Sequence, residues 1–226
     1  MAKRAMVMDL DRCTGCMTCI VACKYENGVG LGEYFCDIAE VGPIGTHPHI
    51  DMYWVPFQCQ QCENAPCIEV CPTGAAYRAD NGVVLIEADA CIGCKTCLTG
   101  CPYSDPDGAA RPSARWYNET TGVVEKCTLC NHLTCQSDGV EDETDTFSTA
   151  HAVPPCVHNC CNKARYFGDL DDENSSASRY LAEQIAAGRS ALSLATDGAE
   201  ASFVYLMSDE SRWQGIDGLK ILQAKA

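Results

Sequence analysis

The chain has 226 residues, which is enough for one domain or two small ones. Its hydrophobic content of 46% includes 19 cysteines, and without them little apolar material remains for a core, so disulfides or metals must hold the fold together. The formal charge of −15 excludes nucleic acid as a partner, because nucleic-acid binding needs a basic face.

The cysteines are not spaced like a disulfide framework. Their number is odd, and most of them stand two or three residues apart, where neighbours cannot easily meet disulfide geometry. The first residues also lack the apolar segment of a secretory signal. No apolar stretch approaches the roughly 18 residues of a membrane span. The pattern therefore favours metal binding, and no direct membrane span is predicted.

The first predicted segment covers residues 1–58. A short apolar run at 7–10 predicts a strand. Directly after it comes the first cysteine quartet, with the spacing C-x2-C-x2-C-x3-C: Cys13, Cys16, Cys19 and Cys23. Cys36 belongs to no quartet and is predicted to be a structural or idle thiol.

The second segment, 59–122, holds two quartets. One has the spacing C-x2-C-x4-C-x3-C and consists of Cys59, Cys62, Cys67 and Cys71. A predicted strand at 83–86 leads to the other, which consists of Cys91, Cys94, Cys97 and Cys101. This quartet repeats the first one at a constant offset of 78 residues, and the matching aspartate, glycine, threonine and tyrosine positions indicate an internal duplication.

The third segment, 123–170, carries the last quartet around an insertion at 131–155. Cys127 and Cys130 form its first half, and Pro155-Cys156-x3-Cys160 copies the end of the second quartet. Cys135 is the alternative third ligand, since it follows Cys130 at the x4 spacing of that quartet; we favour Cys156 because of its proline and x3 step. The acidic residues 136–150 are predicted to form a surface excursion. Cys161 is left over.

The fourth segment, 171–226, is predicted to be a helix and a tail. The helix covers 176–187, with serines as N-cap, Gly188 as its end, and a buried stripe of Tyr180, Leu181 and Ile185. A strand is expected at 203–207, and Trp213 and Ile216 are candidates for docking on another subunit. No segment contains a hydrolytic triad, a phosphate-binding loop or a flavin motif, so no catalytic residue is predicted and the chain is not expected to be an enzyme on its own.

The quartet spacings predict [4Fe–4S] clusters. Three cysteines in a seven-residue loop can surround one face of an iron–sulfur cube, and the fourth, after x3, ligates a second cluster in two-cluster ferredoxins. Gly15 and Gly93 let the backbone pass close to the sulfides. Zinc is the rival metal, but it usually joins two separated C-x2-C pairs, and only Cys127 with Cys130 looks like half of such a site. We therefore predict four clusters, with a zinc-organised binding module as the alternative.

Crossing of the fourth ligands gives four groups of cysteines. The second and third quartets, which are close in sequence, would exchange their last cysteines, and the first and last quartets would do the same across the chain. The predicted ligand groups are Cys59, Cys62, Cys67 and Cys101; Cys91, Cys94, Cys97 and Cys71; Cys13, Cys16, Cys19 and Cys160; and Cys127, Cys130, Cys156 and Cys23. The predicted fold class is α+β, with duplicated ferredoxin-like cores, short strands, large irregular loops and a C-terminal helix.

Three basic side chains stand beside presumed ligands. His132 and His158 are predicted to be hydrogen-bonded neighbours of a cluster or surface residues rather than ligands. Lys126 precedes Cys127, where its charge would raise a nearby reduction potential; an ordinary solvated lysine is the alternative.

These motifs resemble the four-cluster electron-transfer (β) subunit of the dimethyl sulfoxide reductase, or molybdopterin oxidoreductase, superfamily of anaerobic respiration. The resemblance extends over the four quartets and over Cys71-Pro72-Thr73, Lys126-Cys127-Thr128 and the run 167–171. It implies four clusters in a line and the crossed ligation. It also implies a large catalytic subunit that holds the molybdopterin, and an outside partner such as a membrane anchor or a quinol, cytochrome or ferredoxin donor. The chain is then expected to be cytoplasmic, or exported folded with a partner that bears a twin-arginine signal.

The chain departs from this family pattern at several points. Cys161 stands where a proline usually follows the last cysteine, and the insertion at 131–155 is unusual. The run 156–160 is similar to that in the small subunit of a phenol transhydroxylase, which favours a dehydroxylase or transhydroxylase partner over a respiratory reductase. A stand-alone polyferredoxin or a hydrogenase-linked carrier is the alternative function.

Overall fold

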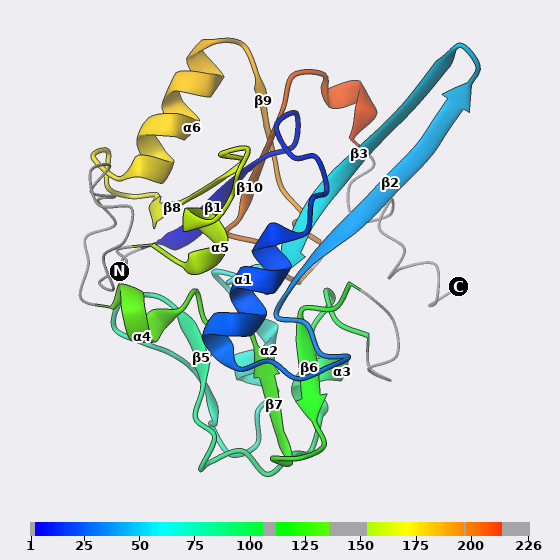
Figure 1. Ribbon diagram of the computed structural model, residues 1–226. Helices are drawn as coiled ribbons and strands as arrows, with labels where there is room; N and C mark the ends of the chain where they lie inside the picture. The colour runs from blue at the N-terminus through cyan, green and yellow to red at the C-terminus, as the bar shows by residue number, and fades with distance from the viewer. Residues whose placement is uncertain (1–2, 106–111, 136–152, 197, 214–226) are drawn as a thin grey trace.

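The structure is a computed structural model that describes residues 3–105, 112–135, 153–196 and 198–213 (Figure 1). Helices and strands in it are short and are joined by long irregular loops. None of the helices in these ranges is long and apolar enough to cross a membrane. The mixture of small sheets and separate helices agrees with the predicted α+β class.

One four-stranded sheet joins the two ends of the described chain. Its order is β8 (Arg165–Asp169), β1 (Arg4–Asp9), β10 (Val204–Met207) and β9 (Ser190–Leu192). In β1, the run from Ala5 to Asp9 is fully buried, as expected for a central strand covered on both faces. It pairs antiparallel with β8 and parallel with β10. The first, third and fourth predicted segments therefore meet in one sheet.

Helix α6 (Ser176–Ala186) covers this sheet (Figure 1). The Ser175 side chain caps the helix by accepting a hydrogen bond from the Ser178 N–H (3.1 Å). Tyr180 and Leu181 pack against a small buried cluster of Val7, Ala177 and Leu206. The predicted stripe is wrong at Ile185, which is 49% exposed and is not among the residues that pack against this cluster.

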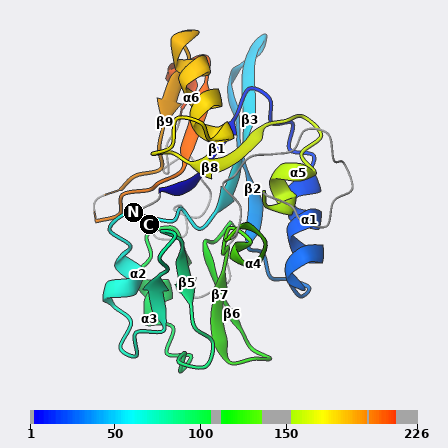
Figure 2. The ribbon, with the colours of Figure 1, turned by 90° about the vertical axis from the view of Figure 1, so that its left-hand side faces the viewer.

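A long hairpin of β2 (Cys36–Thr46) and β3 (His49–Gln58) extends from the body of the molecule (Figure 1). Beside it lie α1 (Thr18–Asn27) and α5 (Pro155–His158), which are neighbours in both views (Figure 2). The first and last quartets are therefore brought together although they are far apart in sequence.

The other half of the molecule consists of two hairpins and three one-turn helices (Figure 2). One hairpin pairs β4 (Ala76–Arg78) with β5 (Val84–Ile86), and the other pairs β6 (Arg115–Asn118) with β7 (Val123–Lys126). The helices are α2 (Pro66–Glu69), α3 (Thr96–Thr99) and α4 (Asn131–Thr134). The predicted segment boundary at 122 falls in the turn of the β6–β7 hairpin, so the second and third segments are continuous there.

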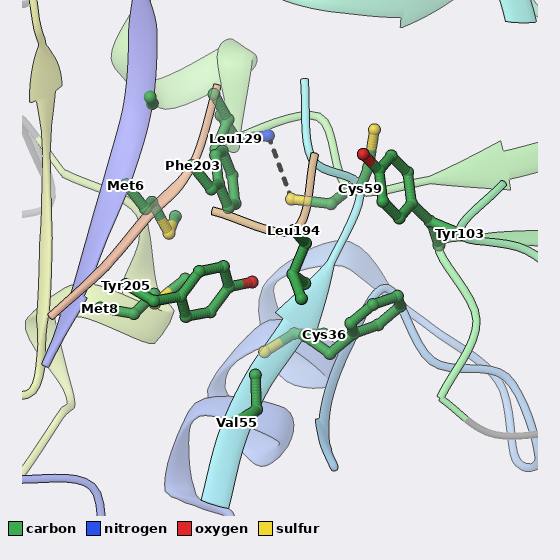
Figure 3. Close-up of a cluster of buried hydrophobic side chains, with 14 of the residues drawn as sticks. Met6, Met8, Cys36, Val55, Cys59, Tyr103, Leu129, Leu194, Phe203 and Tyr205 are labelled. Atoms are coloured by element: carbon green, nitrogen blue, oxygen red, sulfur yellow. Dashed lines mark hydrogen bonds between the residues drawn. The ribbon is translucent and has the colours of Figure 1, made fainter. Parts of the chain in front are cut away.

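A single hydrophobic cluster connects the two halves (Figure 3). Met6 from β1 and Phe203 and Tyr205 from the C-terminal segment lie near Cys59 and Tyr103 from the other half. Many of the cluster members are cysteines, which is consistent with a fold built around its thiols. Strands appear at 4–9, 84–86 and 204–207, where apolar runs predicted them.

The described part of the tail packs on its own chain. Trp213, expected to dock on another subunit, packs at a centroid distance of 5.7 Å from the Tyr205 ring of its own chain. A short 3₁₀ helix, Glu210–Arg212, holds it there. Ile216 and the acidic run 136–150 lie outside the described residues.

Candidate metal centres

Four cavities of similar size are each lined by four of the predicted cysteines. The empty space between the lining residues, including the part open to solvent, is about 330, 300, 310 and 340 Å3 in the order used below. We name them the Cys16 cavity (Cys13, Cys16, Cys19 and Cys160), the Cys127 cavity (Cys23, Cys127, Cys130 and Cys156), the Cys62 cavity (Cys59, Cys62, Cys67 and Cys101) and the Cys94 cavity (Cys71, Cys91, Cys94 and Cys97). In each cavity the fourth cysteine comes from a different quartet.

The cavities differ in burial. All four cysteines of the Cys62 cavity and all four of the Cys127 cavity are buried. By contrast, Cys16 and Cys94 are exposed, and most of the cysteines beside them are only half-buried. We therefore call the Cys62 and Cys127 cavities the inner sites, and the Cys16 and Cys94 cavities the outer sites.

Local backbone geometry places the thiols. In the first and third quartets, Gly15 and Gly93 adopt φ of +65° and +68°, and Met17 and Lys95 then start short helices from a left-handed conformation. In the second and last quartets, a proline at the first helical position precedes Cys67 and Cys156. The two kinds of loop therefore repeat in the backbone as well as in the sequence.

The two glycines are crowded by protein atoms. A β-carbon on Gly15 would lie 2.6 Å from the Trp54 ring, and one on Gly93 would lie 2.5 Å from the Gly122 carbonyl oxygen. Close tertiary packing therefore favours glycine at both positions, in addition to the predicted approach of the backbone to the sulfides.

Backbone N–H groups point at several thiols. Ala76 N–H donates to Cys71 Sγ (3.4 Å), Leu129 N–H to Cys127 Sγ (3.4 Å) and Ala164 N–H to Cys160 Sγ (3.3 Å). Such N–H···S bonds stabilise thiolate charge and tune the potential of a bound cluster.

Burial governs the protonation of inner thiols and of Cys13 in the outer Cys16 cavity. It raises the pKa values of Cys127, Cys130 and Cys156 to about 12, and that of Cys13 to about 11. Without a metal these thiols keep their protons at neutral pH, and a bound metal displaces the proton.

Three buried cations lie among the cysteines, and sequence reasoning missed two of them. Arg165, at the start of β8, lines the Cys16 cavity; its Nη1 donates to Cys36 Sγ (3.3 Å) and its Nη2 to Gln58 Oε1. Arg115, at the start of β6, lines the Cys62 cavity. Lys126 is 2% exposed and donates to the carbonyl oxygens of Val84 and Cys127, so the solvated alternative is wrong.

The cysteines outside the quartets have distinct surroundings. Cys36 is buried and lines the Cys127 cavity as a fifth cysteine. Cys135 is exposed at the end of α4 and is not among the residues that line that cavity, whereas Cys156 is. Cys161 is exposed, with its Sγ 3.7 Å from Cys16 Sγ. His132 is half-exposed at the surface and hydrogen-bonds to Glu26 (2.8 Å).

The residues fit iron–sulfur clusters better than single ions. Within the ranges described, no three His, Cys, Asp or Glu side chains converge closely enough to hold one metal ion. The four cysteines instead stand around a cavity, as ligands of a larger group would. The soft thiolate donors match iron–sulfur chemistry, and the buried guanidinium of Arg115 matches the negative charge of a cluster with four thiolates.

Comparison with known families gives matches to iron–sulfur domains over most of the chain. Residues 50–170 match the 4Fe-4S dicluster domain, and residues 4–25 match a 4Fe-4S binding domain. The matched regions contain all four quartets.

Curated proteins with similar sequences are subunits of oxidoreductases. The chain is 39% identical over 207 residues to the iron–sulfur subunit of a putative dimethyl sulfoxide reductase of Halobacterium salinarum, covering 81% of this chain and 72% of that protein. It is 36% identical to a subunit of the sulfite dehydrogenase of Allochromatium vinosum, covering 81% and 76% of the two chains. It is also 32% identical to the iron–sulfur subunit of the arsenate respiratory reductase of a Shewanella species, covering 79% and 87%.

Proposed function

The chain belongs to the iron–sulfur electron-transfer subunits of molybdopterin oxidoreductases, and from this membership we propose that it carries four [4Fe–4S] clusters, held by the sixteen cysteines of the four cavities. Members of this family transfer electrons for a catalytic subunit and are not catalytic on their own. The four cavities, each lined by four cysteines of the quartets, are the observation that carries the proposal.

Shared neighbours support a linear order of the four sites. Arg165 lines the Cys16 cavity and its charge also reaches Cys156 of the Cys127 cavity. Cys127 and Cys59 lie close enough for their charges to interact, which connects the two inner cavities. Arg115 of the Cys62 cavity acts in the same way on Cys97 of the Cys94 cavity. We therefore propose the order Cys16, Cys127, Cys62, Cys94.

Such an order suits a relay between two partners. When bound, the clusters supply one-electron carriers, and the chain holds them, excludes water from the inner pair and exposes the outer pair. One outer site would face a large molybdopterin-containing catalytic subunit, and the other an outside donor or acceptor such as an anchor subunit. The relatives are named for different substrates, so the substrate is set by the partner and not by this chain.

The repeated loop geometry supports a duplicated, ferredoxin-like origin. Gly15 with Met17, and Gly93 with Lys95, have nearly equal backbone angles although the surrounding elements differ. We propose that two related units, each with two quartets, were joined and later diverged at the insertion 131–155.

Anaerobic purification with the adjacent gene products tests this function. We expect a brown complex with a pterin subunit and about sixteen irons per copy of this chain, with matching sulfide. Zinc in place of iron would refute the cluster assignment. A monomer with full iron that exchanges electrons only with diffusing partners would favour the polyferredoxin alternative.

A further inference from the structure

We infer that Arg115 is the charge-compensating residue of the cluster proposed for the Cys62 cavity, and that its guanidinium raises the reduction potential of that cluster above the value it would have with a neutral side chain. This inference rests on the proposed function, because it concerns a bound cluster. It goes further by giving one side chain a redox-tuning role.

The first observation is that the Arg115 guanidinium is buried without a carboxylate or carbonyl partner among the described residues; the polar neighbours on which it acts are thiols, Cys97 among them. The residue has no exposed surface, and its side chain lines the same cavity as Cys59, Cys62, Cys67 and Cys101. Its Nε, Nη1 and Nη2 atoms are buried and make no well-formed hydrogen bond within the part of the chain that the structure describes. A guanidinium carries five N–H donors, and burying them without acceptors or a counter-charge is strongly unfavourable.

The second observation is a like charge directly opposite. Arg115 and Lys126 are partners in the β6–β7 ladder, and both side chains are buried. Side chains at opposite positions lie on the same face of the hairpin, where like charges repel. Neither forms an ion pair with a carboxylate among the described residues. Since the Lys126 ammonium is occupied by two carbonyl oxygens, Arg115 is the cation left for an anion in the cavity.

Arg165, the other buried arginine that lines a cavity, has more protein partners than Arg115, although its Nε also lacks one among the described residues. Both of its terminal nitrogens have protein partners, namely Cys36 Sγ, Gln58 Oε1 and the Met6 sulfur. The thiols that its charge affects most are Cys36, Cys156 and Cys19, whereas those affected by Arg115 are Cys67, Cys59, Cys101 and Cys97. The two arginines therefore act on separate cavities.

The expected effect follows from charge. Reduction adds one electron to a group that is already negative, and a buried cation with N–H donors stabilises the reduced form more than the oxidised form. Removing the cation must therefore lower the reduction potential of the nearest cluster.

The test is a redox titration, followed by electron paramagnetic resonance, of the anaerobically purified complex. Arg115→Gln should lower the midpoint potential of one of the four cluster signals. At a fixed potential, the ratio of reduced to oxidised cluster should fall at least tenfold, which corresponds to a shift of 59 mV for a one-electron couple. Arg115→Lys, which keeps the charge, should stay within threefold of the unchanged protein. Arg165→Gln, the same change at the other buried arginine, should leave the midpoint potential of that cluster signal unchanged.

The outcomes separate the inference from the proposed function. Full iron content with no cluster signal moved by Arg115→Gln, or an equal shift in Arg115→Lys, overturns the role of Arg115 and leaves the four clusters standing. Iron-free protein overturns both. If Arg115→Gln does not fold, the complex is grown with 15N-arginine and studied by pulsed electron paramagnetic resonance. We expect coupling between arginine nitrogen and a reduced cluster, both in the unchanged complex and in Arg165→Gln. Loss of all such coupling in Arg165→Gln overturns the inference.

Discussion

Cys135 and Cys156 are the two candidates for one place in the last quartet, and they differ in burial. Cys135 repeats the x4 spacing of the second quartet but is exposed at the end of α4. Cys156 is 5% exposed and lines the Cys127 cavity beside Cys127 and Cys130. The proline at the first position of α5 fixes the turn that directs it there.

Replacement of these two cysteines should therefore have unequal effects. We expect Cys156→Ala to lose about four of sixteen irons, and Cys135→Ala to lose none, because only Cys156 faces the cavity. Iron and sulfide assays on anaerobically purified protein measure this difference. The matched substitution at Cys135 is the control, and iron loss from that variant instead would exchange the two assignments.

The sequence revealed the cysteines of the site but not the cations between them. Ligand loops are local, so the x2 and x3 steps can be recognised in any short window. Arg115 becomes notable only when the hairpin register sets it opposite Lys126, and Arg165 only when β8 pairs with β1. Trp54 comes into contact with the Gly15 position through the β2–β3 hairpin, which no local pattern near Gly15 could indicate.

Among the elements, the contact between β1 and the segment after α6 depends on one buried ion pair. The Asp9 side chain is fully buried, and Arg189 donates to both of its oxygens at 2.6 Å. The Tyr180 hydroxyl from α6 donates to Asp9 as well (2.6 Å). Burial alone would raise the pKa of Asp9, but the hydrogen bonds from Arg189 and Tyr180 outweigh it and leave the pKa below its ordinary value.

Removal of Arg189 should destabilise the sheet. Arg189→Met leaves a buried carboxylate without its cation, at a cost of about 3 kcal/mol. We expect the apparent Tm to fall by roughly 6–12 °C for a chain of this size. Anaerobic thermal unfolding followed by circular dichroism gives the measurement. Arg212→Met, which breaks a more exposed pair with Asp51, is the matched control and should change the Tm by about 3 °C or less.

The same pair sets a pH dependence with a defined sign. Because the folded-state pKa of Asp9 is lowered, its contribution to stability is complete above the unfolded-state value of about 3.9 and is lost as the pH falls through the folded-state value. The Tm difference between the unchanged protein and Arg189→Met should be largest at neutral pH and shrink as the pH falls, because burial raises the pKa of Asp9 once Arg189 is gone, and protonation then removes the uncompensated charge. A difference that grows on acidification would contradict this assignment.

Strands and helices marked by a short apolar run or a capping residue could be predicted from the sequence. The pairing of strands that are far apart in the chain could not. The apolar run before the first quartet and the capped helix after residue 175 are visible in sequence. The order of the four-stranded sheet is not, because β10 joins β1 in parallel across almost the whole chain. For the same reason the strand expected at 203–207 could not be given a partner from the sequence, although together with β9 it completes that sheet.

At the scale of the whole molecule, the two halves are connected through the inner cavities. Gln61 accepts from the Val84 N–H (2.8 Å) and donates to the Cys127 carbonyl oxygen (3.0 Å), and Ser202 donates to the Gln61 carbonyl oxygen (2.7 Å). Tyr103 donates to the Ala199 carbonyl oxygen (3.4 Å) from the wall of the Cys62 cavity. The outer cavities do not lie between the two halves in this way, because their cysteine loops reach the surface at Cys16 and Cys94.

Loss of an inner site should therefore reduce the iron content and the thermal stability more than loss of an outer site. Cys62 and Cys94 are both second cysteines of a C-x2-C step, but Cys62 is 9% exposed within the core and Cys94 is exposed. We expect Cys94→Ala to lose about four irons and keep its fold, because the other cavities do not depend on it. Cys62→Ala should lose more than four irons and unfold at lower temperature, since it leaves Arg115 buried beside an incomplete site. Iron assays and anaerobic thermal unfolding of the two variants compare them directly, and equal losses in both would show that the inner sites do not hold the halves together.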